Sequence, residues 1–432
     1  MRNTRRAPAP DCPGSIGAIR REEDGKVRVA VLVRRFPELS ETFILNQMTG
    51  LLDQGVDLEV FAWTPGDSEA VHPDVSAYAL LGRTRYIHPK GARLARLGRT
   101  LSRVVGGRGW RSPGFLRRSL DLRRHEGAGA SLFLLHAGAT FLQGEPHDVV
   151  HCQFGRLGLT ALALRKAGAL PGRIVVSFRG SDLSRHRDTE GYEELFQAGS
   201  LFLPVCGAFR DRLISMGCDP GKIRVHHSGI DLRRFTWTPR HREPGEPFRL
   251  ITIARLVEKK GVEYGIRAVA ELHGAGREVE YTVIGEGPLE RELRGLAREL
   301  GVAEKVRFLG PLDHDEVVAH LGEAHVLLAP SVTAANGDQE GIPNVLKEAM
   351  ATGIPVVSTL HSGIPELVED GVSGFLVEER DARALAERTA HLMDHPERWG
   401  PMGEAGRARV EAEYDSVRLN RELEGFYREL SA

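Results

Sequence analysis

Short apolar runs alternate with helix-like amphipathic stretches along most of the chain. In the first half, the apolar runs fall at residues 27–33, 57–62, 148–152, 173–178, 201–205 and 223–227. In the second half the alternation repeats six times, with strands expected near residues 248, 280, 306, 326, 355 and 374. Parallel strands need a crossover connection, usually a helix, so this alternation predicts parallel sheets. The fold class is therefore α/β, with one doubly wound sheet in each half.

A polar, proline-rich stretch separates the halves at residues 236–247, where the pattern restarts. The chain has 432 residues, which suffices for two cores, because single cores stop growing near roughly 250–300 residues. We expect a disordered tail at 1–25, a first domain at 26–238 and a second at 246–415. Two such domains facing each other form a cleft at the carboxyl ends of the strands, where ligands bind.

Composition narrows the class of protein. Hydrophobic residues make up 41% and charged residues 27%, and the net charge of −1 gives no overall attraction to nucleic acid. No run of 18 apolar residues occurs, so we expect no membrane span, and the first residues lack the apolar core of a signal peptide. The cysteines are too few and too scattered for a disulfide framework or a zinc site, so we read them as reduced thiols of a cytoplasmic protein. They are Cys12, Cys152, Cys206 and Cys218.

Two carboxylates lie eight positions apart around a proline in residues 338–351. Pro343 lacks an N–H and has a preset φ, so it suits the first turn of a helix. Glu340 then lies in the preceding loop, and Glu348 lies a turn or more inside the helix. Eight helical steps span roughly 12 Å, too far for the carboxyl pair of a retaining glycosidase at about 5.5 Å. We expect separate tasks on one ligand, with an anion such as a diphosphate at the helix start.

This run resembles the E-x7-E donor-binding motif of the retaining glycosyltransferases of family 4, which have the GT-B fold. The resemblance implies that Glu340 contacts the donor sugar and that Glu348 binds the ribose hydroxyls. It also implies donor contacts from the residues between them, Gly341, Pro343 and Asn344. The expected fold has two Rossmann-like domains facing a central cleft, with a final helix that crosses back to the first domain.

Neighbouring segments match the family in the same order, strongly over residues 205–432 and more loosely before. Arg255 and Lys260 follow an apolar strand and resemble the family's phosphate-binding pair, in which Arg offers a planar fork and Lys a point charge. The resemblance gives them, with Glu340, catalytic roles. Gly285 and Gly287 end the next strand in a turn that lets backbone approach a ligand. The final helix is expected over about 416–432.

The first half should hold the acceptor. Ser40, Glu41 and Thr42 belong to a segment that resembles S-E-T-F-I of bacterial exopolysaccharide transferases of the colanic-acid type. Ser40 can cap a helix that begins at Glu41, with its free amides directed into the cleft. An ordinary capped helix start explains Ser40 equally well.

Two further strand ends carry candidate residues of the first half. The segment H-C-Q-F-G resembles the family's H-x-H-F-G, which makes His151 a catalytic candidate beside the structural role common for a single His there. The next segment matches F-H-G-x-D, but Arg179 stands where many members have a His near the transferred sugar. Arginine cannot act as a base at neutral pH, although it can bind acceptor or phosphate charge. Gly180 would allow close approach, and Asp182 would bind an acceptor hydroxyl or cap the next turn.

Two features point to other chemistry. Asp313-His314-Asp315 spells D-x-D, which holds a divalent metal in other transferases, but it precedes a helical pattern that Asp would cap. We therefore expect no metal and no cofactor. Residues 83–125 contain 13 Arg and Lys against one acid, with apolar residues at helical spacing. Two interpretations of this segment remain: it contacts the inner face of an anionic membrane, or it is a solvated basic face packed on its own domain.

The sequence thus predicts a retaining, metal-independent glycosyltransferase of the hexosyltransferase type. It would move a sugar from a nucleotide diphosphate donor to a carbohydrate, lipid-linked or small-molecule hydroxyl, in exopolysaccharide or lipid-linked oligosaccharide assembly. Natural-product glycosylation would use the same fold and donor motif. A nucleotide-sugar epimerase would share the cleft without needing the acceptor segment. A non-catalytic membrane or polyanion binder would rest on 83–125 and leave Arg255, Lys260, Glu340 and Glu348 unexplained.

Overall fold

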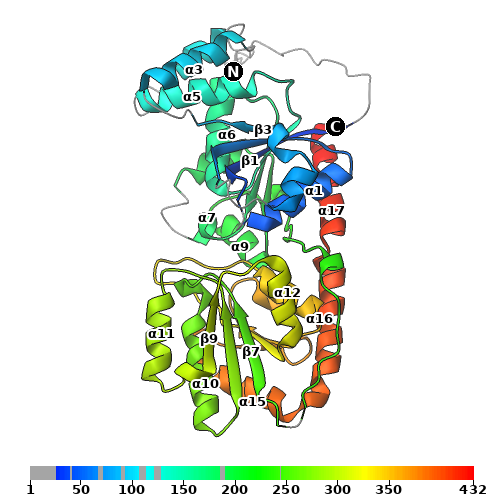
Figure 1. Ribbon diagram of the computed structural model, residues 1–432. Coiled ribbons are helices and arrows are strands. Elements are labelled where there is room, and N and C mark those ends of the chain that lie inside the picture. The colour runs from blue at the N-terminus through cyan, green and yellow to red at the C-terminus, as the bar shows by residue number, and fades with distance from the viewer. Residues whose placement is uncertain are drawn as a thin grey trace, which may run out of the picture.

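Two six-stranded parallel sheets, one in each half of the chain, lie one above the other in the computed structural model (Figure 1). The expected tail at 1–25 and Ser40 lie outside the residues that the structure describes. No helix of that part of the chain is long and apolar enough to cross a bilayer. The structure describes residues 26–38, 41–66, 72–88, 93–106, 113–120, 128–184, 190–243 and 245–432.

The first sheet has the strand order β3-β2-β1-β4-β5-β6, with parallel pairing throughout. Its central strand is apolar on both faces, as expected where helices cover both sides of a parallel sheet. Two core clusters lie on the two faces. The strands are β1 (Arg28–Phe36), β2 (Asp57–Pro65), β3 (Thr84–Tyr86), β4 (Val149–Cys152), β5 (Arg173–Phe178) and β6 (Leu201–Pro204).

The strand expected at 223–227 is wrong. This segment runs beside β6, where the Arg224 N–H donates to the Phe202 carbonyl at 3.0 Å, but only an isolated bridge forms. The sixth strand is instead β3, a three-residue edge strand that pairs with β2. Its residues Thr-Arg-Tyr are all only half-buried, so they lack the apolar run by which the other strands are recognised.

Helices cover the first sheet on both faces. In Figure 1, α3 and α5 lie at the end of the molecule farthest from the second sheet. The helices are α1 (Thr42–Asp53), α2 (Pro73–Ala77), α3 (Arg93–Gly106), α4 (Pro113–Ser119), α5 (Ala128–Phe141), α6 (Gly155–Ala167), α7 (Ser181–Ser184), α8 (Tyr192–Ala198) and α9 (Gly207–Ser215).

The second sheet has the order β12-β11-β10-β7-β8-β9, and each strand begins within one residue of the position that the apolar pattern predicts. Its strands are β7 (Phe248–Ile253), β8 (Val279–Ile284), β9 (Val306–Gly310), β10 (Val326–Ala329), β11 (Val356–Thr359) and β12 (Phe375–Val377). The helices are α10 (Val262–Gly274), α11 (Glu290–Glu299), α12 (His314–Glu323), α13 (Asn344–Ala351), α14 (Ile364–Leu367), α15 (Ala382–Asp394), α16 (Trp399–Glu413) and α17 (Ser416–Ser431).

The final helix α17 crosses back to the first half, as the sequence predicts. It starts where the Asp415 side chain accepts the Val417 N–H at 3.1 Å, and then runs beside the first sheet's helix α1 (Figure 1). Leu423 and Tyr427 are fully buried in the same core cluster as the residues of β1. The first half is therefore built partly from the last helix of the fold.

The carboxyl ends of the two sheets face each other and are in direct contact. The Gln339 N–H, in the loop after β10, donates to Ser184 Oγ of the first half at 3.1 Å. The Glu366 carboxylate on α14 accepts the N–H groups of Gly207 and Ala208 at 2.7 and 3.3 Å, at the start of α9. These contacts lie at the strand ends, where doubly wound sheets bind their ligands.

Candidate active site between the two sheets

The loop after β10 leads into α13, which carries the second carboxylate of the motif. Pro343 ends the loop with φ −59° and ψ 131°, so the helix begins at Asn344 rather than at the proline. This corrects the expected position of Pro343 by one residue, because its fixed φ is compatible with extended backbone as well as with a helix. Glu340 lies in the loop and Glu348 in the second turn of α13, as the sequence predicts.

Glu340 lies between two ammonium groups. Its Oε1 is 2.9 Å from Lys259 Nζ, and its Oε2 is 2.9 Å from Lys260 Nζ. Burial opposes ionisation of this carboxyl, but attraction and hydrogen bonds from Lys260 and Lys259 outweigh it and lower the pKa to about 2. Glu340 is therefore a fixed negative charge at neutral pH.

Lys259 is a site residue that the sequence reasoning missed. It precedes Lys260 in a short 3-10 turn after β7, but its side chain is only 10% exposed. Lys259 Nζ lies 3.2 Å from Asp338 Oδ1 and 3.4 Å from the Gln339 carbonyl oxygen, in addition to its bond to Glu340. The doubled lysine is visible in the sequence, but its inward direction is not.

A buried histidine fixes the backbone of Glu340. The Glu340 N–H donates to His361 Nε2 at 3.0 Å, so the ring proton lies on Nδ1, which donates to Glu379 Oε1 at 2.5 Å. Glu379 also accepts the Thr333 N–H at 2.7 Å, at the other end of the same loop. No sequence pattern marks His361 or Glu379 for this task.

Two members of the predicted donor set have no hydrogen-bond partner for their charged groups within the described part of the chain. Arg255 follows β7 and is exposed. Glu348 is half-buried by area, yet burial of its carboxyl outweighs attraction by Lys347 and Lys260 and raises its pKa to about 7. Both groups have the chemistry to bind a ligand: Arg255 could pair with phosphate oxygens and Glu348 could accept hydroxyl hydrogen bonds.

The expected glycines pack backbone against backbone. A Cβ on Gly285, whose φ is +120°, would lie 2.1 Å from the Ala254 carbonyl oxygen. A Cβ on Gly287 would lie 2.5 Å from the Leu256 carbonyl oxygen. These glycines therefore let the turn after β8 lie against the turn that carries Arg255. A Cβ on Gly341 would meet the Val205 side chain of the first half at 2.6 Å.

Ser228, in the segment that joins the two halves, accepts hydrogen bonds from one cationic side chain of each half. Lys347 on α13 is fully buried, and its Nζ donates to the Ser228 carbonyl at 2.6 Å. Burial lowers the pKa of Lys347 to about 7. From the first half, Arg179 Nη1 donates to Ser228 Oγ at 2.8 Å. Burial also lowers the pKa of Arg179, to about 10, so it remains charged at neutral pH.

Arg179 and Asp182 organise the first half's side of the cleft. Arg179 Nη2 donates to Gln153 Oε1 at 2.7 Å, so the glutamine in the H-x-H-F-G segment meets the arginine in the F-H-G-x-D segment. The Asp182 carboxylate accepts the N–H groups of Gly155 and Gly180, both at 2.9 Å, and is 6% exposed, so it joins the start of α6 to the turn before α7. A Cβ on Gly180 would lie 3.7 Å from the Gln339 carbonyl oxygen of the second half.

His151 lies in the core rather than at the cleft. Its ring has no exposed surface, with Nδ1 2.6 Å from the Tyr427 hydroxyl and Nε2 2.8 Å from Ser177 Oγ. Burial holds the pKa of His151 well below its ordinary value, so the ring is neutral. Gln153 nevertheless links this ring to Arg179: its Nε2 is 3.5 Å from His151 Nδ1 and its Oε1 accepts from Arg179, whose charge also lowers the pKa of His151.

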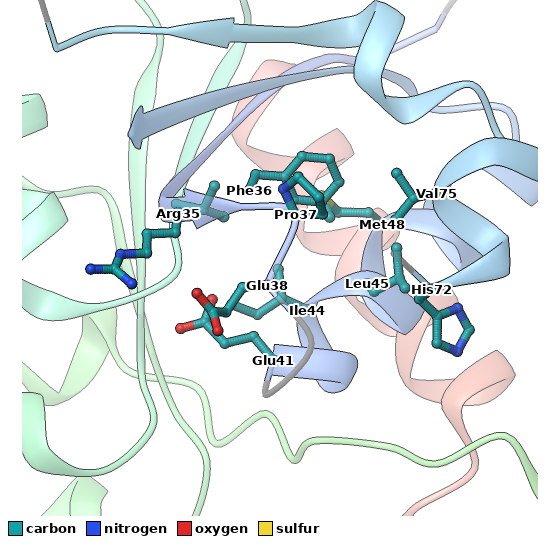
Figure 2. Close-up of a pocket in the computed structure, with 11 residues that line it drawn as sticks. Arg35, Phe36, Pro37, Glu38, Glu41, Ile44, Leu45, Met48, His72 and Val75 are labelled. Atoms are coloured by element: carbon teal, nitrogen blue, oxygen red, sulfur yellow. The ribbon is translucent and has the colours of Figure 1, made fainter. Parts of the chain in front are cut away.

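A small pocket lies beside the start of α1. The helix begins at Thr42, one residue later than expected, and Glu41 is its N-cap without a side-chain cap bond. In Figure 2 the Glu38 and Glu41 carboxylates lie close together at one side of this pocket. Burial, and next the charge of Glu38, raise the pKa of Glu41 to about 7. The pocket is lined by Val33, Arg35, Phe36, Pro37, Glu38, Glu41, Ile44, Leu45, Met48, His72 and Val75.

The D-x-D sequence forms a helix cap, as expected. Asp313 Oδ1 accepts the Glu316 N–H, and Glu316 Oε2 accepts the Asp313 N–H, both at 2.9 Å at the start of α12. In the described residues, no three or more His, Cys, Asp or Glu side chains are grouped so that they could hold a metal ion.

Two family models divide the chain between them. Residues 40–234 match the model described as Glycosyltransferase Family 4, and residues 233–409 match Glycosyl transferases group 1. A putative colanic acid biosynthesis glycosyltransferase, WcaL of Salmonella typhimurium, is 39% identical over 92% of this chain and 98% of its own. The chain belongs to these glycosyltransferases. The amylovoran biosynthesis glycosyltransferase AmsK of Erwinia amylovora is 37% identical to the transferase, over 92% of this chain and 98% of its own.

The fold has solved counterparts. Anabaena Alr3699/HepE, crystallised with UDP and glucose, superposes on the transferase with a TM-score of 0.69 at 16% identity, covering 93% of this chain and 99% of its own. At this identity the likeness concerns the fold alone. It agrees with the GT-B arrangement that the sequence predicts for this transferase.

Proposed function

We propose that this glycosyltransferase moves a sugar from a nucleoside diphosphate sugar to a hydroxyl of a growing extracellular polysaccharide, with retention of anomeric configuration. The observation that carries the proposal is the charge arrangement at the carboxyl edge of the second sheet. In the described part of the chain, the charged groups of Arg255 and Glu348 have no hydrogen-bond partner, and the Lys260 ammonium group bonds only to Glu340. The names of WcaL and AmsK, which refer to colanic acid and amylovoran, support a polysaccharide acceptor.

On the donor side, Arg255 and Lys260 bind the diphosphate oxygens, one as a fork and one as a point charge. The free N–H groups at the start of α13, from Asn344 on, favour the same anion. Glu348 accepts the ribose hydroxyls, and Glu340 the hydroxyls of the sugar. UDP and glucose bound to the related fold of HepE support a nucleotide sugar as donor.

On the acceptor side we assign Glu41, Thr42, Arg179 and Gly180, and the proximity of Arg179 to Glu41 supports this grouping. Arg179 remains protonated at neutral pH, so it is no base. We therefore assign the acceptor proton to the departing diphosphate: the bond from the anomeric carbon to the phosphate oxygen breaks, the bond to the acceptor oxygen forms on the same face, and the proton moves to a phosphate oxygen. We assign His151, buried between Tyr427 and Ser177, a positioning role that acts through Gln153 on Arg179.

The donor assignment is tested by thermal unfolding with UDP-, GDP- and ADP-sugars. A ligand at 100 times its dissociation constant should stabilise the native protein by about 2.7 kcal/mol. The Arg255→Met/Lys260→Met double variant should lose this stabilisation and, through loss of charge stabilisation at the leaving group, roughly 100-fold or more of transfer. Arg267→Met, which removes an exposed cation on α10, is the control with the same substitution and should respond as the wild type does. Wild-type ligand response in the double variant would exclude this donor site.

We propose further that part of residues 83–125 contacts an anionic membrane. Leu101 and Val105 on α3 are 51% and 69% exposed, and Arg117 and Arg118 on α4 are exposed as well. Apolar side chains beside cations are typical of helices that lie on a membrane surface. Flotation with vesicles of phosphatidylglycerol, but not of phosphatidylcholine, should carry the protein, and Leu101→Gln/Val105→Gln should reduce that fraction. Equal flotation of variant and wild type would refute the contact.

A further inference from the structure

We infer that Lys259 is a positioning residue, which holds Glu340 and its loop in place while the neighbouring Lys260 binds the donor diphosphate. The two lysines are adjacent in sequence and have the same charge, but the structure gives them different surroundings. The inference rests on the donor site proposed above. It gives different roles to Lys259 and Lys260, which the sequence alone does not distinguish.

The number of acceptor oxygens within reach, in hydrogen bonds or ion pairs, separates the two ammonium groups. An ammonium group has three donors. Lys259 Nζ has three acceptors, at 3.2 Å on Asp338, 3.4 Å on the Gln339 carbonyl and 2.9 Å on Glu340. Lys260 Nζ has a single acceptor among the described residues, Glu340 Oε2 at 2.9 Å. Lys260 therefore has donors left for a phosphate, and Lys259 has none.

Lys259 is also the more deeply buried of the two lysines. The side chain of Lys259 is 10% exposed, and the carboxylates that it contacts, Asp338 and Glu340, are 9% and 14% exposed. The Lys260 side chain is 18% exposed, the more accessible of the two lysines. A buried carboxylate without a counter-ion is strongly destabilised. When Lys260 turns from Glu340 to a phosphate, Lys259 remains as the cation that neutralises the buried Glu340.

The backbone of the loop supports this division. His361 holds the Glu340 N–H at 3.0 Å, and Lys259 holds the Gln339 carbonyl and the Glu340 side chain. The carboxylate therefore keeps one bound oxygen, Oε1, throughout donor binding, while Oε2 is released by Lys260 and can accept from the sugar. Lys259 acts on the reaction through Glu340 and does not touch the donor.

Matched substitutions to methionine at the two lysines test the inference. Calorimetric titration with UDP and with GDP measures product affinity, and release of UDP from UDP-glucose or of GDP from GDP-mannose measures turnover. Lys260→Met should weaken the nucleoside diphosphate roughly 10- to 100-fold through loss of a charged hydrogen bond. Lys259→Met should leave that affinity within about 3-fold and lower kcat by roughly 100-fold, as small misplacements of catalytic groups do. Lys259→Arg should recover part of kcat.

A double-mutant comparison separates positioning from simple damage to the fold. If Lys259 acts through Glu340, then Lys259→Met should add little to the loss in a Glu340→Gln background. Full additivity would overturn the inference, as would an affinity loss in Lys259→Met equal to that in Lys260→Met. Wild-type kcat in Lys259→Met would overturn it too. Unchanged nucleotide affinity in Lys260→Met would instead refute the donor site itself, whatever Lys259→Met does.

Discussion

Two glutamates of one motif have opposite acid strengths because their surroundings differ. Glu340, between two lysines, has its pKa lowered to about 2, whereas burial raises the pKa of Glu348 to about 7. Glu340 is thus held as an ion before any ligand arrives. Glu348 changes charge near neutral pH. The contrast agrees with separate tasks for the two carboxyl groups on a single donor.

Calorimetry can separate these tasks. Glu348→Ala should weaken binding of the free nucleoside diphosphate, because a carboxylate that accepts hydroxyl hydrogen bonds contributes on the order of 1.5–3 kcal/mol per bond. Glu340→Ala should leave that affinity nearly unchanged and lower turnover of the intact donor, since Glu340 is assigned to the sugar. Equal losses of affinity in both variants would refute the division, even if both residues proved essential.

The raised pKa of Glu348 also predicts a pH dependence of stability. Between its ordinary pKa of 4.5 and about 7, the unfolded chain releases this proton and the native state keeps it. The contribution of Glu348 is therefore fully present below pH 4.5 and is lost as the pH rises through 7. The side chain at position 348 cannot ionise in the Glu348→Gln variant. The melting temperature of this variant, relative to that of the wild type, should therefore rise between pH 5 and pH 8, by roughly 2–4 °C for each kcal/mol of unfolding free energy that the wild type loses. Scanning calorimetry that gives a constant difference would contradict the shift.

At the residue scale, motif spacing and strand ends predicted Glu340, Glu348 and Lys260 as neighbours: Lys260 contacts Glu340, and its charge acts on Glu348. Arg255 follows β7 as predicted, and its place in the donor site stays a prediction. Sequence chemistry could not find Lys259 or His361, whose roles depend on side-chain direction in a folded loop. It also placed His151 among the catalytic candidates, although the ring is buried beside α17. A strand end looks the same in sequence whether its last side chain points to the cleft or to the core.

At the scale of single elements, helix α12 provides the test for metal. Asp313 and Glu316 form a reciprocal cap, so their oxygens are already committed to backbone N–H groups. Asp313→Ala should therefore lower stability by about 0.5–2 kcal/mol, measured by urea unfolding, without changing turnover. Turnover should also survive EDTA, since cations of the chain handle the leaving charge. Activity restored only by Mg²⁺ or Mn²⁺ after chelation would overturn the proposed metal-independent chemistry.

Most strands could be predicted because each is an apolar run between turn residues. Two segments of the first half were predicted wrongly from this pattern. Residues 223–227 are apolar enough to be read as a strand, but they make only an isolated bridge beside β6. Strand β3 is recognisable only from its pairing with β2. Local pattern predicts the propensity of a segment, whereas membership of a sheet depends on the neighbour that it meets.

At the scale of the whole molecule, Glu366 joins the two halves. Its Oε1 accepts the N–H groups of Gly207 and Ala208 at 2.7 and 3.3 Å, at the positive end of helix α9. A carboxylate in such a position contributes up to about 2 kcal/mol, which corresponds to roughly a 30-fold shift between closed and open arrangements. Glu366→Ala should accordingly increase the radius of gyration measured by small-angle X-ray scattering without ligand.

The control for this experiment lies three residues away. Glu369 is exposed on the same segment, and Glu369→Ala removes an equal charge without touching α9. Its scattering profile should match that of the wild type. Identical profiles for all three proteins would mean that Glu366 does not hold the two halves together.

The path of α17 has a consequence for biosynthesis. Leu423 and Tyr427 complete the core around β1, but a ribosome makes them only after the whole second sheet. Domains generally fold as units during synthesis, in order along the chain. Here the first half is synthesised before α17, so part of its core stays uncovered until the second half and α17 have been made. The two halves therefore mature together, and a nascent chain halted before residue 416 exposes apolar surface that chaperones must cover.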